Sequence, residues 1–126
     1  MRKLTIKGFQ KQLEHKQRDL LIKERVRCEM YEYNPRCFIT PTVADHAFSR
    51  MIRNLFFVKS NLTVMCQGCH TKKTFDSEFA MQLFEHVRRR EGDKEFNRIR
   101  KIARKRQPFP KWNSWDYLEK IEKKLK

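Results

Sequence analysis

The sequence predicts an α+β fold, in which a small two-stranded core is flanked by several α-helices. Two cysteine pairs, Cys28/Cys37 and Cys66/Cys69, bracket a stretch rich in β-branched and aromatic residues. Apolar residues recur at helical spacing on both sides of that stretch. The length of 126 residues fits one domain with a modest core, which a bound metal would supplement. The predicted parts are a basic N-terminal helix (1–27), the core (28–75) and a helical, basic C-terminal region (76–126).

The charge of the chain favours a polyanionic partner. Thirty Lys and Arg residues stand against 15 Asp and Glu residues, which gives a formal net charge of +15. Nucleic acid is the first candidate for such a partner and an anionic membrane surface is the second. No apolar run approaches the ~20 residues of a membrane span, and no apolar signal segment follows the basic N-terminus. We therefore expect an intracellular, cytoplasmic protein, in which cysteines serve as metal ligands or free thiols rather than disulfides.

The first half of the chain predicts one helix and a hairpin. A helix is expected over about 10–25, because no glycine or proline interrupts that stretch and apolar residues recur along it. The apolar residues that recur with rough helical spacing are Phe9, Leu13, Leu20, Leu21 and Val26. Residues 43–48 predict a short strand, and 61–65 lead into the second cysteine pair. Residues 49–59 fit either a short helix or turn followed by a strand.

The second half predicts helices with recognisable ends. One helix should begin near Gly68 to His70. Asp76-Ser77 is expected to cap the next helix, and Gly92 is expected to end it. Asp93 is expected to cap a further helix, which the prolines of 108–110 break. Ser114 can cap a final helix. Its apolar stripe over 115–125 would pack onto the domain or onto a second subunit, so a homodimer is possible.

The four cysteines predict a structural metal site. Cys66 and Cys69 have the CxxC spacing of a zinc knuckle. Cys28 and Cys37 are separated by eight residues, whereas two to four are usual. Four thiolates around one Zn²⁺ would join the N-terminal part to the central stretch. The alternative is a set of buried free thiols.

Acidic and imidazole side chains are expected to meet beside this metal site. Asp45 and His46 sit at the end of the predicted strand, and His70 follows the second knuckle cysteine at the start of a helix. In a hairpin followed by a packed helix, these three side chains can converge. One carboxylate and one imidazole would then hold a divalent cation, and the second imidazole would be free to act as a base. His15 and His86 have no such partners, and we interpret them as structural or surface residues.

The ordered set Asp45-His46, Asn61-Leu62 and Cys66-x-x-Cys69-His70 resembles the HNH endonucleases, the ββα-metal nucleases, over about residues 28–75. The resemblance implies a treble-clef-like core and hydrolysis of DNA phosphodiester bonds. It implies that His46 is the general base, that Asp45 and His70 hold Mg²⁺ or Mn²⁺, and that Asn61 ties the hairpin loop together. The basic first helix and the later helices resemble phage NinG-type recombination proteins. The ending Trp-Asp-Tyr-Leu-Glu resembles that of phage endonuclease VII, which implies recombination or junction processing.

Clustered cations are the expected contacts to duplex or branched DNA, since phosphate contacts hold DNA without reading its bases. The candidates are Arg50, Arg53, Lys72, Lys73, Arg88, Arg89, Arg90, Arg100, Lys101, Arg104 and Lys105. For Arg50, Arg53, Lys72 and Lys73, the alternative interpretation is ordinary solvent-exposed charge with no role in DNA binding. A zinc-containing module that binds nucleic acid without catalysis would use the same charge and cysteines, and it remains the alternative function.

Overall fold

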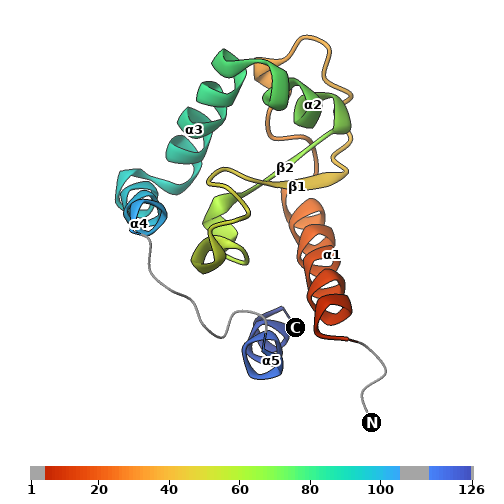
Figure 1. The fold of residues 1–126 in the computed structure, drawn as a ribbon. Helices are drawn as coiled ribbons and strands as arrows, with labels where there is room; N and C mark the ends of the chain where they lie inside the picture. The colour runs from red at the N-terminus through yellow and green to blue at the C-terminus, as the bar shows by residue number, and fades with distance from the viewer. Residues whose placement is uncertain (1–4, 106–113, 126) are drawn as a thin grey trace.

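A computed structural model describes residues 5–105 and 114–125 of the chain. The described residues form five α-helices, three short 3₁₀ turns and one two-stranded sheet (Figure 1). This arrangement confirms the predicted α+β class. The expected break at residues 108–110 lies outside the described part. No helix in that part is long and apolar enough to cross a bilayer.

The first helix, α1 (Ile6–Arg25), packs through a narrow stripe. Thr5 caps it by accepting a hydrogen bond from the N–H of Gly8 at 3.0 Å, so it begins four residues before the predicted start. Its buried residues recur four apart: Phe9, Leu13, Gln17 and Leu21. Leu20 and Val26, which belong to the same apolar recurrence, do not lie on this stripe. Their exposed fractions are 43% and 74%, because Leu20 lies off the stripe and Val26 already lies beyond the helix.

Strands β1 (Val43–His46) and β2 (Leu62–Met65) form an antiparallel hairpin. The register pairs Asp45 with Thr63 and His46 with Leu62, so the acid–histidine pair lies at the loop end of the hairpin. The first strand ends two residues earlier than predicted. The connection contains two 3₁₀ turns, η2 (Arg53–Leu55) and η3 (Lys59–Asn61), and no strand, which resolves the open choice for residues 49–59.

Three helices follow the hairpin. Helix α2 (Gln67–Phe75) is capped by Cys66, and α3 (Ser77–Glu91) by Asp76, whose side chain accepts from the N–H of Phe79. Gly92 ends α3 with φ 88°, a conformation that favours glycine. Gly92 also stands at the N-cap of α4 (Asp93–Arg104), so Asp93 is the first helical residue rather than the expected cap.

The last helix, α5 (Trp115–Lys124), returns to the first. Ser114 caps it as predicted, accepting from the N–H of Tyr117 at 3.3 Å. Leu118 and Ile121 are buried in one cluster with residues of α1 and of the hairpin connection. Part of the stripe expected over 115–125 thus packs onto its own chain, which is one of the two arrangements predicted for it.

A larger core lies between the cysteine loops, α2, α3 and α4. It includes Met30, Leu55, Met65, Leu83 and Ile99, which are fully buried. This core fixes α2 against the hairpin, so residues of α2 reach the loop end of β1.

Candidate metal centre and active-site pocket

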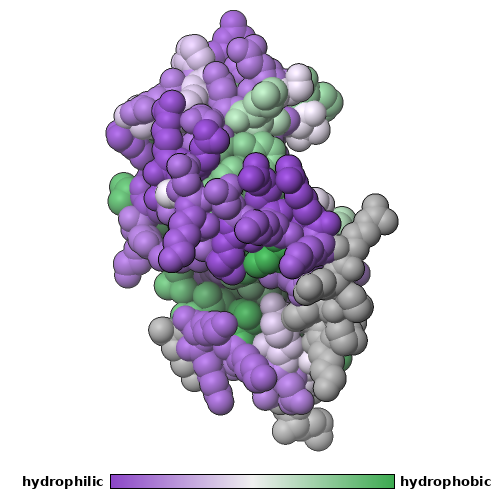
Figure 2. All heavy atoms as spheres, turned by 90° about the vertical axis from the view of Figure 1, so that its left-hand side faces the viewer, coloured by the Kyte–Doolittle hydropathy of each residue, from purple (hydrophilic) through white to green (hydrophobic). Residues whose placement is uncertain are grey.

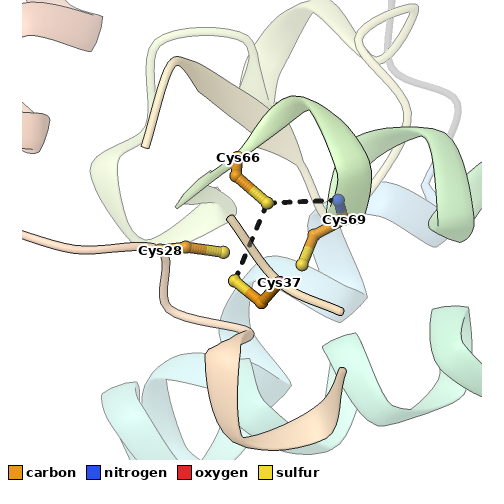
Figure 3. Close-up of side chains that lie close together, drawn as sticks. All are labelled: Cys28, Cys37, Cys66 and Cys69. Carbon is orange, nitrogen blue, oxygen red and sulfur yellow. Dashed lines mark hydrogen bonds between the residues drawn. The ribbon is translucent and has the colours of Figure 1, made fainter. Parts of the chain in front are cut away.

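The four cysteines converge on one point, although they come from segments far apart in the sequence (Figure 3). Their sulfur atoms all lie within 4.8 Å of one another, and the Sγ atoms of Cys37 and Cys66 are 3.7 Å apart. Tetrahedral zinc with Zn–S distances near 2.3 Å requires sulfurs about 3.8 Å apart. The cluster could therefore bind a metal ion such as Zn²⁺, and the widely spaced pair takes part in it.

Nitrogen donors already surround these sulfurs. The Sγ of Cys66 accepts from the N–H groups of Cys69 at 3.3 Å and Phe38 at 3.5 Å. Ile39 donates its N–H to the Sγ of Cys37 at 3.2 Å and has φ 71°, which is unusual for a β-branched residue. Asn34 donates to the Sγ of Cys69 at 3.3 Å. Such donors stabilise negative charge on sulfur, as a thiolate–metal site needs.

Burial and hydrogen bonding shift the pKa values of these thiols in different directions. Burial acts to raise the pKa of Cys66, but the hydrogen bonds from Cys69 and Phe38 outweigh it and lower that pKa to about 7. Burial raises the pKa of Cys28 to about 11 and also raises the pKa of Cys69. A bound cation would hold all of these sulfurs as thiolates at neutral pH.

A second group of polar side chains lines an open pocket of about 550 Å³ at the loop end of the hairpin. The pocket brings together the three residues predicted to carry chemistry, Asp45, His46 and His70. They meet because β1 supplies the first two and the first turn of α2 supplies the third. Glu14, Arg50 and Lys73 also line the pocket.

Asp45 is a buried carboxylate with cationic and imidazole neighbours. Its Oδ1 lies 3.3 Å from Nδ1 of His70, and its Oδ2 lies 2.5 Å from Nζ of Lys73. Nδ1 of His70 is buried and has no hydrogen-bond partner within the described part of the chain. Two ligand atoms 3.3 Å apart can share one cation at about 2.1–2.3 Å from each. The orphaned nitrogen and the carboxylate oxygen thus fit a divalent cation.

His46 is held in a defined orientation. Its Nε2 is 3.0 Å from the carbonyl oxygen of Phe56, and its ring lies 4.9 Å from the Phe56 ring. A carbonyl can only accept, so Nε2 carries the proton and Nδ1 of the neutral ring keeps its lone pair. Burial lowers the pKa of His46, which keeps the ring neutral at pH 7.

Asn61 is fully buried beneath the loop of the hairpin rather than in the pocket. Its Oδ1 accepts from the N–H of Phe48 at 2.8 Å. Its Nδ2 donates to the carbonyls of Phe48 and Leu55 at 3.1 and 3.2 Å. The side chain therefore ties the hairpin connection together and supports the segment that precedes Phe56.

Several predicted DNA contacts are engaged inside the protein. Arg90 lies in a buried network, where its guanidinium donates to Glu29, Thr63 and the carbonyl of Ser60 at 2.7 to 3.0 Å. Its side chain is only 16% exposed, so Arg90 cannot contribute to a DNA surface in this conformation. Lys73 is bound to Asp45 and is 24% exposed. In this conformation, a carboxylate of the protein is therefore the partner of each of these two cations.

The remaining predicted cations lie nearer to solvent. Arg50 is exposed and pairs with Glu14 at 3.1 Å, while Arg53 is half-buried on η2. Lys72 extends over the Phe79 ring, with its Nζ 5.2 Å from the ring centroid. The others are exposed on α3, on α4 or directly after α4: Arg88, Arg89, Arg100, Lys101, Arg104 and Lys105. Figure 2, which looks onto this side of the molecule, shows mainly hydrophilic side chains across its middle.

Three participants were not predicted from the sequence. Glu14 reaches the pocket from α1, 31 positions before Asp45, and no local pattern connects the two. The Phe56 carbonyl is a backbone group, which any residue type would provide. Glu29 accepts from Arg25, Arg90, His86 and the N–H of Val64. Glu29 is an acidic residue directly after a candidate metal ligand, Cys28, in a strongly basic chain, and this position could have identified it as a candidate.

No family model, curated protein or solved structure matches this chain. The resemblance of the sequence motifs to the HNH endonucleases therefore stays a prediction.

Proposed function

We propose that this protein is a metal-dependent endonuclease of the HNH type, which hydrolyses phosphodiester bonds of DNA. One observation carries the proposal: the pocket that holds the pair Asp45–His70 also holds His46, whose Nε2 is engaged by the Phe56 carbonyl. A neutral imidazole beside a candidate cation site is the combination that such hydrolysis uses. By its resemblance, the protein would process recombination intermediates of a phage or mobile element.

The residues divide the reaction between them. Nδ1 of His46 takes a proton from the attacking water, and the Phe56 carbonyl stabilises the imidazolium that results. Asp45 and His70 would hold Mg²⁺ or Mn²⁺, which supplies charge stabilisation for the phosphate and the leaving 3′-oxygen. The resemblance implies products with a 5′-phosphate and a 3′-hydroxyl.

The cysteine cluster and this pocket share the first turn of α2. Cys69 directly precedes His70, so a zinc ion held by the four thiolates would fix the first turn of the helix that presents His70. We infer a treble-clef-like core, in which zinc joins the loop after α1 to the hairpin and α2. The exposed cations of α4 would hold the DNA backbone.

One observation favours the alternative of a non-catalytic zinc-containing nucleic-acid-binding module. Asp45 is paired with Lys73 at 2.5 Å, as a carboxylate with a purely structural role would be. That alternative accounts for the contact between His70 and Asp45, but it assigns no role to the neutral, oriented ring of His46. We therefore prefer the nuclease.

The test is His46→Ala, assayed for cleavage and for binding of labelled DNA in the presence of Mn²⁺. Cleavage should fall at least about 100-fold, because general base catalysis contributes roughly 10²–10⁴. Affinity for DNA should change less than about twofold, because His46 carries no charge at neutral pH. His15→Ala is the matched control, since His15 is an exposed histidine of α1, and it should cleave at the wild-type rate. Equal cleavage by wild type and His46→Ala would remove His46 as the base.

A further inference from the structure

Lys73 is paired with Asp45, whose carboxylate is a proposed ligand of the catalytic cation. Its Nζ lies 2.5 Å from Oδ2 of Asp45 and 3.0 Å from the carbonyl oxygen of His46. The neighbouring Lys72 on the same helix extends over the Phe79 ring instead. One of two adjacent lysines is therefore directed into the pocket, and the other is directed elsewhere.

We propose that Lys73 is an internal counter-ion, which competes with the divalent cation for Asp45 and releases this carboxylate when the phosphodiester of the substrate binds. The inference rests on the proposed function, because it concerns the same cation site. It adds a role for a residue that the mechanism above does not use.

Electrostatics supports the competition. A cation shared by Oδ1 of Asp45 and Nδ1 of His70 would lie within a few ångströms of an ammonium group bound to Oδ2 of the same carboxylate. Like charges at such a distance repel strongly in a partly buried site. One buried carboxylate cannot neutralise both, so Lys73 weakens the binding of the cation for as long as it stays in place.

The release has a physical route. Lys73 has a flexible four-carbon stem, and its side chain is 24% exposed, so its ammonium can reach the open side of the pocket. A phosphodiester that enters the pocket offers the ammonium a new anionic partner. DNA and the divalent cation would then each favour the binding of the other, since coupling between two ligands is reciprocal.

The experiment measures Mn²⁺ binding to the zinc-loaded, full-length protein without DNA, by electron paramagnetic resonance of the free ion. Lys73→Gln should bind Mn²⁺ at least about tenfold more tightly than wild type, since it removes a positive charge beside the site. Lys72→Gln is the matched control, because it removes the same charge one residue away, and its affinity should stay within about twofold of wild type. Lys73→Arg keeps a cation in place, so its affinity should stay near the wild-type value even if Lys73→Gln folds poorly.

The outcomes separate this inference from the nuclease itself. Equal Mn²⁺ affinity of Lys73→Gln and Lys72→Gln, in a protein that cleaves DNA, would overturn the counter-ion role alone. Tighter binding by Lys73→Arg than by wild type would also overturn it, because the cation at Asp45 would still be present. If neither wild type nor any variant bound Mn²⁺ or cut DNA, both the inference and the proposed function would fall.

Discussion

At the scale of single residues, the role of a basic side chain here depends on the carboxylate that it meets. Arg90 belongs to an arginine run that looks like a DNA contact, but it binds Glu29. Burial acts to raise the pKa of Glu29, whereas the hydrogen bond from His86 and the charges of Arg90 and Arg25 outweigh it and hold that pKa at about 2. This cluster joins α1, β2 and α3.

Replacement of Arg90 should therefore affect stability rather than DNA binding. Arg90→Gln removes one partner of Glu29 but leaves Arg25, His86 and the N–H of Val64 in place, so the free energy of unfolding should fall by about 1–3 kcal/mol. Urea unfolding measures this change. Arg89→Gln is the control, because the Arg89 side chain is 68% exposed, and its effect should stay within about 0.5 kcal/mol. Equal stability of the two variants would show that the network contributes little.

At the scale of elements, the two faces of α4 differ sharply in polarity. Phe96 and Ile99 are buried against the main core, while Arg100, Lys101 and Arg104 are exposed. Acidic residues in the first turn and basic residues in the last turn also complement the helix dipole. The exposed face thus gathers cations with few competing carboxylates near its C-terminal end, which is what a phosphate-binding surface requires.

Removal of these charges should flatten the salt dependence of DNA binding. The variant replaces four residues by Gln: Arg100, Lys101, Arg104 and Lys105. Each phosphate contact adds about 0.9 to the slope of log affinity against log salt, so the slope should fall by up to about 3.6. A matched variant of α1, with Lys7, Lys11, Lys16 and Lys23 replaced by Gln, removes the same charge and should leave the slope nearly unchanged. If both variants lowered the slope equally, only net charge would matter.

Both ends of α3 and the start of α5 were the parts of the fold that the sequence predicted best. Asp76, Gly92 and Ser114 act locally, through hydrogen bonds within three residues or through backbone conformation, so their types reveal their positions. The hairpin connection could not be predicted, because its turns depend on the buried Asn61 and on packing of Leu55. The pairing of Lys73 with Asp45 and of Arg90 with Glu29 spans 28 and 61 residues, and no local pattern encodes such distances.

At the scale of the whole molecule, two clusters connect the ends of the chain to its centre. The cysteine cluster joins the loop after α1 to the hairpin and α2. The smaller apolar cluster joins α1, α5 and the hairpin connection through Leu13, Phe56 and Leu118. Since Phe56 also supports His46, the packing of the terminal helices reaches the pocket.

A metal at the cysteine cluster should make folding depend on zinc. We expect one Zn²⁺ per chain by native mass spectrometry, in addition to any ion at the pocket. Cys37→Ser should lose this zinc and about 3 kcal/mol or more of unfolding free energy, because binding of a structural metal contributes directly to folding. Retention of zinc and of stability by Cys37→Ser would contradict a four-thiolate site. A chelator should lower the melting temperature of the wild type.

Metal-dependent cleavage of DNA is the central claim, and supercoiled plasmid tests it most directly. The zinc-loaded wild type is incubated with plasmid and Mg²⁺, Mn²⁺ or a chelator, and nicked and linear forms are separated on a gel. The pocket of Asp45, His46 and His70 predicts nicked or linear product with at least one of the two ions and none with the chelator. Plasmid that stays supercoiled with both ions, although the protein binds it in a salt-dependent manner, would contradict the nuclease and favour the binding module.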